Sequence, residues 1–428
     1  MDVTDACTRS TRSVPPKDWS ITPLSEITCE IVDCNHSTPT WTSSGVVVIR
    51  NQNIRDGKLD LTNVSYTNEA HYFERVRRAK PSAGDLVITR EAPMGQVCMI
   101  PLGLRCCLGQ RMVLLKIAKD SANSIYVLYA LQTDSIQKFM QNAGGTGSTV
   151  ANLRLPVIRS LPIPTPSQLE QNAIATALSD MDALLDGLDR LISKKRDLKQ
   201  TAMQQLLTGK TRLPGFRGEW EIKRLGDLAQ LSKVGVVPLS APEKLYTHFS
   251  LPSFDAGEKP QIETGASIGS NKFIVPQDAV LLSKLNPRIP RVWAPLEIPP
   301  NSVCSTEFLV LIPDVGMDRN FLKYSCMSAH FSSQMELHAI GTTGSHQRTQ
   351  PNQAMTIEVP VPTEPAEQIA IATVLSDMDA ELAALEARRD KTRALKQGMM
   401  QELLTGRTRL LKPEPVEPEA AYALPASI

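Results

Sequence analysis

Apolar residues recur every seven positions in two long stretches of the chain, and polar or charged residues fill the positions between them. This spacing is typical of a coiled-coil seam on a helix rather than of a broad core face. We therefore predict two helices of about 40 residues, each roughly 60 Å long, that need a partner helix. The predicted seam residues are Ile174, Leu178, Met181, Leu185 and Leu188 in the first stretch, and Ile371, Leu375, Met378, Leu382 and Leu385 in the second.

The two stretches are copies of each other. Residues 171–213 and 368–410 align at a constant offset of 197 without a gap, with about 27 of 43 positions identical, and both end in LLTG-[Lys/Arg]-TRL. Each copy is the natural partner of the other, so we expect an antiparallel pair with pseudo-two-fold symmetry. Ser167 with Glu170 predicts a capping box, and Pro365 fits a first helical position. Gly209 and Gly406 fit helix C-caps.

A globular domain precedes each helix. Both domains open alike, with Trp19 or Trp220 followed by spaced leucine and isoleucine residues, and both end in a proline-rich, strand-like segment. Buried strands are predicted near 45–50, 84–90, 112–118 and 301–313, and amphipathic helices near 124–140 and 321–340. The fold class is therefore mixed α/β. The predicted boundaries are 1–160 and 214–358 for the domains, 161–213 and 359–410 for the helical spacers, and 411–428 for a disordered tail.

Composition excludes several classes of protein. The 46 basic and 45 acidic residues nearly cancel, so a chain that held DNA alone through phosphate contacts would be expected to be more basic. No apolar stretch is long enough to cross a bilayer, and the N-terminus lacks a signal sequence, so we expect a cytoplasmic protein without membrane contact. The eight cysteines and six histidines form no metal-binding or acid–base pattern. We expect no metal site and no catalytic residue.

The chain resembles the specificity subunits of type I restriction–modification systems over nearly its whole length. The resemblance rests on the helical repeats with Glu170-Gln171 and Glu367-Gln368 at their starts, on the KQ…LLTG ends, and on the tryptophan-led domain openings. It rests also on GDLVITREAPMG at 84–95 and VLLSKLNPR at 280–288.

This resemblance implies a DNA-reading subunit without enzymatic activity. It implies that the two domains are target-recognition domains, each reading one half of a split site in double-stranded DNA. It also implies that the helices set the gap and dock two methyltransferase subunits, which restriction subunits then join. No cofactor is expected in this chain, whereas the partners would use S-adenosylmethionine, ATP and Mg. Residues inserted or deleted near LLTG are expected to change the gap and leave the half-sites unchanged.

Three short motifs suggest an enzyme, and each is incomplete. Gly209-Lys210-Thr211 matches the end of a P-loop, but the glycine required five positions earlier is Gln204. Asn286-Pro287-Arg288 begins like an adenine methyltransferase motif, but lacks the second proline and the aromatic residue. The glycines at 144–147 lack the third glycine of a dinucleotide loop. A coiled-coil adaptor without DNA readout is the alternative function, although it does not explain why the domain interiors differ.

Candidate DNA-reading residues lie in polar loops, because Arg, Lys, Asn, Gln and small hydroxyl groups read base edges. In the first domain, Arg90, Glu91 and Met94 follow a strand, and the alternative for the first two is a mutual ion pair. The second domain offers a basic loop at 284–291, and a glycine loop precedes each helix. The remaining candidates are Thr146, Thr149, Asn152 and Arg154 in the first domain, and Lys284, Asn286, Arg288, Arg291, Thr343, Ser345, His346 and Arg348 in the second.

A further basic cluster lies on a predicted helix. It contains Arg75, Arg77, Arg78 and Lys80, and we expect a phosphate contact or a solvated face there rather than base readers.

Overall fold

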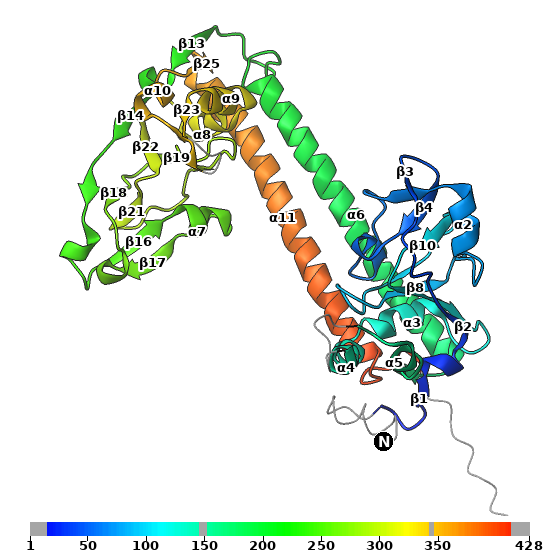
Figure 1. Ribbon diagram of the computed structural model, residues 1–428. Coiled ribbons are helices and arrows are strands. Elements are labelled where there is room, and N and C mark those ends of the chain that lie inside the picture. The colour runs from blue at the N-terminus through cyan, green and yellow to red at the C-terminus, as the bar shows by residue number, and fades with distance from the viewer. Residues whose placement is uncertain (1–14, 145–151, 342–345, 412–428) are drawn as a thin grey trace, which may run out of the picture. The chain divides into compact units, whose positions relative to one another are not determined.

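The computed structural model describes residues 15–144, 152–341 and 346–411 (Figure 1). It divides into two compact units: unit 1 contains residues 1–187 and 389–428, and unit 2 contains residues 188–388. Each unit therefore combines one globular domain with one part of each long helix. The boundaries predicted above, in which each domain is followed by its own helical spacer, describe the order along the sequence and stay a prediction. Most of the predicted tail lies outside the described residues.

The first domain is built on two four-stranded sheets. One is antiparallel, in the order β2-β11-β8-β9, and the other has the order β10-β4-β7-β3, with β10 parallel to β4. Two further antiparallel pairs, β1 with β12 and β5 with β6, complete the strands. The strands are β1 (Ser20–Pro23), β2 (Thr28–Asp33), β3 (Trp41–Thr42), β4 (Val46–Ile49), β5 (Ile54–Arg55), β6 (Lys58–Leu59), β7 (Ser65–Thr67), β8 (Leu86–Thr89), β9 (Val97–Met99), β10 (Cys106–Leu108), β11 (Met112–Ile117) and β12 (Pro162–Thr165). The helices are η1 (Leu24–Glu26), η2 (Asn51–Asn53), α2 (Glu69–Arg75), α3 (Ser124–Leu131), α4 (Asp134–Gly144) and α5 (Leu155–Arg159).

The second domain repeats this architecture in outline. Its antiparallel sheet has the order β14-β22-β19-β20, and its second sheet, β15-β18-β21-β16-β17, again contains one parallel pair, β16 with β21. The strands are β13 (Trp220–Arg224), β14 (Ala229–Ser232), β15 (Gly235–Val236), β16 (Leu245–Phe249), β17 (Gln261–Thr264), β18 (Lys272–Ile274), β19 (Val280–Ser283), β20 (Val292–Trp293), β21 (Ser302–Ser305), β22 (Phe308–Pro313), β23 (Ala339–Ile340), β24 (Arg348–Thr349) and β25 (Glu358–Pro362). The helices are η3 (Leu225–Asp227), η4 (Pro238–Ser240), α7 (Leu251–Asp255), η5 (Gly265–Ser267), α8 (Arg319–Met327), α9 (Ala329–Leu337) and α10 (Pro351–Ala354).

The antiparallel sheet of each domain is buried on both faces, which explains its nearly continuous apolar strands. In β8, Leu86 and Ile88 pack with Tyr126 of α3, whereas Val87 belongs to a separate core cluster on the other face. In β19, Val280 and Leu282 likewise lie in one cluster and Leu281 in another. Because side chains alternate along a strand, a sheet covered on both faces has no polar alternation.

The two long helices, α6 (Gln168–Leu206) and α11 (Pro365–Leu403), pair antiparallel within each unit. In unit 1, Glu170 near the start of α6 bonds Arg409 beyond the end of α11, and Asp182 bonds Lys396. In unit 2, Lys199 bonds Asp379, the equivalents of Lys396 and Asp182 at the offset of 197. The predicted antiparallel pairing is therefore confirmed within each unit, and residues at equivalent positions of the repeat make equivalent bonds in the two units.

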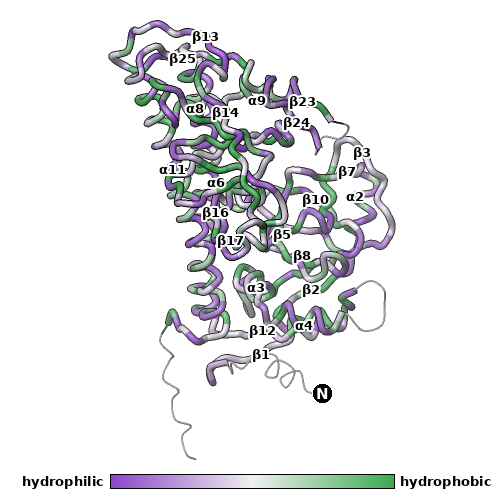
Figure 2. The backbone as a smooth tube through the Cα atoms, turned by 90° about the vertical axis from the view of Figure 1, so that its left-hand side faces the viewer, coloured by the Kyte–Doolittle hydropathy of each residue, from purple (hydrophilic) through white to green (hydrophobic). Residues whose placement is uncertain are grey.

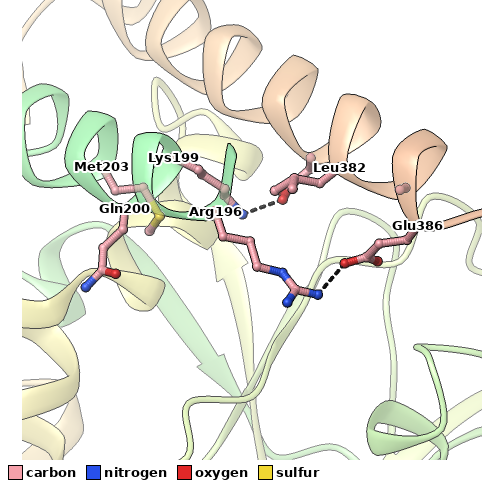
Figure 3. Close-up of a pocket in the computed structure, with 8 residues that line it drawn as sticks. Arg196, Lys199, Gln200, Met203, Leu382 and Glu386 are labelled. Carbon is pink, nitrogen blue, oxygen red and sulfur yellow. Dashed lines mark hydrogen bonds and ion pairs between the residues drawn. The ribbon is translucent and has the colours of Figure 1, made fainter. Parts of the chain in front are cut away.

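Figure 3 shows the helix pair in unit 2, where α6 carries Arg196 and Lys199 and α11 carries Leu382 and Glu386. An ion pair joins Arg196 to Glu386 across the two helices. In Figure 2 the long helices carry both hydrophobic and hydrophilic residues along their length.

The predicted seam residues are mostly buried. Seven of the ten are less than 10% exposed, and Met181, Met378 and Leu385 are half-buried. In the first turns of each helix, however, the seam residues pack into a domain core rather than against the partner helix alone. Ile174 and Leu178 belong to the core of the first domain, and Ile371 and Leu375 to that of the second. Both ends of each helix therefore pack into a domain core, since Leu206 belongs to the core of the second domain and Leu403 to that of the first.

Three local predictions need correction. Residues 124–140 and 321–340 each contain two short helices, because Thr133 interrupts the first segment and Ser328 caps α9 by accepting from Phe331 N. Ser167 accepts a bond from Glu170 N at 3.4 Å, but the Glu170 side chain bonds Trp19 and Arg409. The reciprocal half of the capping box is therefore wrong, because a buried ion pair uses that carboxylate.

Candidate nucleic-acid interface

The residues that repeat at the helix ends form a clasp inside each unit. In unit 1, Arg409 donates to both carboxylate oxygens of Glu170 (2.6 and 2.7 Å), whose side chain is 1% exposed. Trp19 donates to the same carboxylate (3.1 Å), and the guanidinium of Arg409 lies over its ring. The carboxylates of Glu170 and Asp18, which both accept bonds from Arg409, raise the pKa of Arg409. The TRL motif and the opening tryptophan thus hold the start of one helix to the end of the other.

Unit 2 contains a similar clasp, although Trp220 Nε1 has no hydrogen-bond partner among the described residues. Arg212 donates to both oxygens of Glu367 (2.6 Å each), which is fully buried, and lies over the Trp220 ring. Gly209 has φ +67°, and a Cβ there would lie 3.0 Å from Trp220. The C-cap glycine therefore also makes room for the tryptophan, and Lys210-Thr211 belongs to a helix end rather than to a phosphate loop.

The glutamines after these buried glutamates join helix to domain. The Gln171 side chain accepts from Asn123 N at 2.9 Å and donates to Pro166 O at 3.0 Å. Gln368 makes the equivalent bonds, to Asp318 N and to Pro362 O. The repeated Glu-Gln pair thus has a structural role, which leaves the domain loops as candidates for ligand contact.

In the first domain, the structure brings the two candidate segments together. Leu153 N donates to Arg90 O at 2.8 Å, and the Arg90 guanidinium bonds Leu153 O (3.0 Å), Asn152 Oδ1 (3.4 Å) and Asp33 Oδ2 (2.8 Å). The Arg90 side chain is only 14% exposed. It is therefore better placed to hold the two loops together than to read a base.

The alternative prediction, an ion pair between Arg90 and Glu91, is wrong, because each of the two side chains pairs with another residue. Glu91 pairs with Arg111 at 2.9 Å and accepts a bond from Asn152 Nδ2 at 3.2 Å. Met94 packs against the core and fills the space that a side chain at position 144 would need. Arg154 is exposed and has no side-chain partner among the described residues.

The second domain brings its two candidate loops together in the same way. Thr349 N donates to Lys284 O at 3.0 Å, and Asn286 N donates to Gln347 O at 2.8 Å. Since β19 holds the place in its sheet that β8 holds in the first domain, both loop pairs follow equivalent strands. The sequence predicted both sets of residues, and their contact is a product of the fold.

The arginines in these two loops of the second domain differ in whether an acidic side chain already pairs with them. Arg291 forms two bonds to Asp255 (2.7 and 2.9 Å) and lowers the pKa of that carboxyl. Arg348 bonds Glu307, which raises the pKa of Arg348, and its side chain stays 41% exposed. Arg288 is exposed and has no side-chain partner in the described part of the chain.

Other candidates are placed less informatively. Asn286 adopts φ +49°, and its Oδ1 is buried without a partner in the described structure. His346 is exposed, and its carbonyl oxygen accepts a bond from Arg348. Thr146, Thr149, Thr343 and Ser345 lie outside the described residues.

The basic cluster of the first domain needs correction. Arg75 is 8% exposed, and its guanidinium donates to the carbonyl oxygens of Leu108, Ser37 and Asn35 (2.8–2.9 Å). It is a structural cation rather than a solvated or phosphate-binding one. Helix α2 ends at Arg75, so the other three cations of the cluster lie beyond it.

Within the described residues, no group of histidine, cysteine or acidic side chains has the geometry of a metal site. No helix in that part of the chain combines the length and apolar character needed to span a membrane.

Comparison with known proteins identifies relatives of the chain. Residues 16–194 match the family described as type I restriction modification DNA specificity domain. A putative type I restriction enzyme MjaX specificity subunit from Methanocaldococcus jannaschii is 24% identical over 50% of this chain and 53% of its own length. The MjaIX specificity subunit of the same organism is 28% identical over 36% of this chain and 38% of its own length. The chain thus spans about half the length of the first relative and less of the second.

Two solved structures share the fold. The S subunit of a type I restriction–modification system from M. genitalium aligns over 90% of this chain and 96% of its own, with a TM-score of 0.58 and 15% identity. A chain from a structure of type I R-M complex assembly and conformational transition aligns over 92% of this chain and 100% of its own, with a TM-score of 0.55 and 15% identity. The resemblance to type I specificity subunits is confirmed by these findings.

Proposed function

We propose that the chain is the DNA sequence-specificity subunit of a type I restriction–modification complex, because residues 16–194 match the type I restriction modification DNA specificity domain. Each domain reads one half of a split site in double-stranded DNA, and the long helices hold the two readers. The chain itself is not an enzyme, and the chemistry belongs to its partners.

One observation carries this proposal. The residues that repeat between the two halves, such as Glu170 with Arg409 and Glu367 with Arg212, are used inside the units as clasps. The loop pairs follow equivalent strands but differ in sequence, as two readers of different half-sites require. A coiled-coil adaptor without DNA readout would not need two loop pairs that differ in this way.

The partners are part of the same proposal. Two methyltransferase subunits dock on the helices, restriction subunits join the complex, and these partners use S-adenosylmethionine, ATP and Mg. The described residues include cations without side-chain partners, such as Arg154 and Arg288, but the whole chain carries a net charge of only +1. A partner that contributes phosphate contacts would supply the rest of the electrostatic attraction to DNA. We place this complex in the cytoplasm, where chromosomal DNA is accessible.

The test is to map adenine methylation in cells that contain this chain and its methyltransferase partner. We expect a split motif with one modified adenine in each half-site. Arg288→Ala should relax one position of the half-site read by the second domain and weaken binding by about 1–3 kcal/mol. A continuous motif, or methylation that does not depend on this chain, would contradict the proposal.

A further inference from the structure

A polar cleft of about 380 Å³ opens on the first domain beside the Arg90–Gly95 loop. Four segments that are far apart in the sequence meet there: the region of β3, the turn at η2 after β4, the Ala92-Pro93 bend, and the turn between β10 and β11. Figure 1 shows β3, β4 and β10 in this part of the domain. The lining residues are Pro39, Trp41, Arg50, Asn51, Gln52, Ala92, Pro93, Gly109, Gln110 and Arg111.

An exposed aromatic–cation pair stands at this cleft. Trp41 is 45% exposed, and the guanidinium of Arg50 lies 5.1 Å from the centre of its ring. Arg50 is itself exposed and makes one long bond, 3.4 Å, to Ser65 Oγ. The pair therefore orders a cation at the surface without neutralising it, which suits contact with a phosphate.

Amide groups at the cleft are available for hydrogen bonding. Gln52 is exposed and has no side-chain partner in the described structure. The amide nitrogen of Gln110 donates to Thr38 Oγ1 (3.2 Å) and to His36 O, which leaves its side-chain oxygen to accept. Arg111 adopts φ +67° and is 59% exposed, although one of its nitrogens bonds Glu91. These are the side-chain types that distinguish base pairs in the major groove.

Hydrogen bonds and close packing also fix the backbone segments that form the cleft. Asn51 Nδ2 donates to Glu91 O at 3.2 Å and to Ala92 O at 3.4 Å, which ties the η2 turn to the loop after β8. Gly109 leaves no space for a side chain, because a Cβ there would lie 2.9 Å from Ile49 O. A reading surface needs such fixed positions, since a displaced donor loses its hydrogen bond to the base.

We propose that this cleft reads the first half-site. Gln52, Gln110 and Arg111 contact base edges in the major groove, and Arg50, held on Trp41, contacts the adjacent phosphate. Glu91 neutralises Arg111, whereas Arg50 bonds no carboxylate among the described residues, so the cleft keeps one positive charge, which suits DNA. This inference rests on the proposed function and assigns readers that differ from Arg90, which is committed to Asp33.

The test uses the full chain with its methyltransferase partner, methylation mapping in cells, and binding to duplexes that carry the mapped site. We expect Gln52→Ala to relax one position of a single half-site and to leave the other half-site and the gap unchanged. Arg50→Met should weaken binding roughly tenfold for all sequences and reduce its dependence on salt. Trp41→Ala should act like Arg50→Met, and Trp41→Phe should restore binding.

Lys119→Ala is the matched control, because Lys119 is exposed in the same domain and does not line the cleft. The inference fails if the wild-type complex reads a split site while Gln52→Ala and Gln110→Ala behave like this control. It also fails if both glutamine variants weaken all sequences equally without changing the motif, since the cleft would then contact only the DNA backbone. If the wild-type complex reads no split site, the proposed function itself is wrong.

Discussion

Glycines in and after the long helices occupy two kinds of environment. Gly209 and Gly406 have φ of +67° and +71°, and a Cβ at either position would meet a ring, Trp220 in one case and Pro16 in the other. Gly187 and Gly398 lie inside the helices, and a Cβ there would meet nothing within 4 Å. The same residue type is therefore required at the helix ends and tolerated in the interiors.

This contrast predicts substitutions of opposite sign. Gly209→Ala should destabilise the chain by about 1–2 kcal/mol through the left-handed backbone alone, and the contact with Trp220 adds to this. Gly187→Ala and Gly398→Ala should each stabilise by about 0.5–1 kcal/mol, because they lower the entropy of the unfolded chain. Urea unfolding midpoints measure both effects. A stabilising Gly209→Ala would contradict the role given to the clasp.

Burial also sets the reactivity of the cysteines. It raises the pKa of Cys98, Cys106, Cys304 and Cys326 to about 12 and that of Cys107 to about 11. Because the thiolate is the reactive form, these side chains should resist alkylation. Cys29, by contrast, is exposed.

We therefore expect a single alkylation site in the folded chain once Cys7 is replaced. In a Cys7→Ser variant, which removes the cysteine outside the described residues, iodoacetamide at pH 8 should modify Cys29 and spare the others. Urea should make all seven remaining cysteines reactive. Mass spectrometry of the intact chain counts the adducts, and a second adduct forming as fast as the first would refute the assigned burial.

At the scale of elements, the ion pairs at the helix ends differ in how far the acidic side chain of each pair is buried. Glu170 is 1% exposed and relies on Arg409, whereas Arg407 and Glu402 are 55% and 46% exposed and 3.7 Å apart. An exposed pair contributes less than about 1 kcal/mol, but a buried carboxylate that loses its partner costs several. Neighbouring arginines of one motif thus have unequal effects on stability.

We expect Arg409→Met to destabilise the chain by about 3–5 kcal/mol. Arg407→Met, two residues away, is the matched control and should cost less than about 0.5 kcal/mol. Adding Glu170→Gln to Arg409→Met should recover part of the loss, because the charge is then removed while Trp19 keeps an acceptor. If denaturant unfolding gave equal losses of unfolding free energy in the two single variants, Arg409→Met would not leave Glu170 as a buried charge without a partner.

The sequence predicted elements that depend on local pattern. The seven-residue period identified α6 and α11, and the apolar runs identified β4, β8 and β11, because both signals lie within a few neighbouring residues. It did not predict that Arg90 bonds Asp33, 57 positions away, or that Glu307 holds Arg348. Partner choice among several acids depends on which strands become neighbours, and a single sequence does not reveal that.

The cleft of the first domain was missed for the same reason. Trp41, Arg50, Gln52 and Arg111 come from separate segments, and none lies in a motif that stands out alone. By contrast, the residues of the candidate loops were predicted individually, because glycine clusters and strand ends can be recognised in the sequence. Their contact, through Leu153 with Arg90 and Thr349 with Lys284, required the fold.

At the scale of the whole molecule, each compact unit takes residues from both long helices, with the division at Gly187 in α6 and near Arg388 in α11. The clasps fix the helix ends to the domains, so a change beside LLTG would disturb Trp19 or Trp220 as well as any spacing. A change in the middle of both helices avoids the clasps. It therefore tests the proposed spacing role more cleanly than a change at LLTG.

We expect one heptad inserted after Gly187 and another after Ala384, its equivalent, to lengthen the gap between the half-sites. Seven helical residues add about 10 Å, or roughly three base pairs, and a heptad keeps the seam in phase. Five-residue insertions at the same positions are the control, because they rotate the apolar face away from its partner and should abolish methylation. Methylation mapping reads the result. A heptad variant that keeps the original gap but changes a half-site would show that the helices do not set the spacing, and that the domains alone determine the whole site.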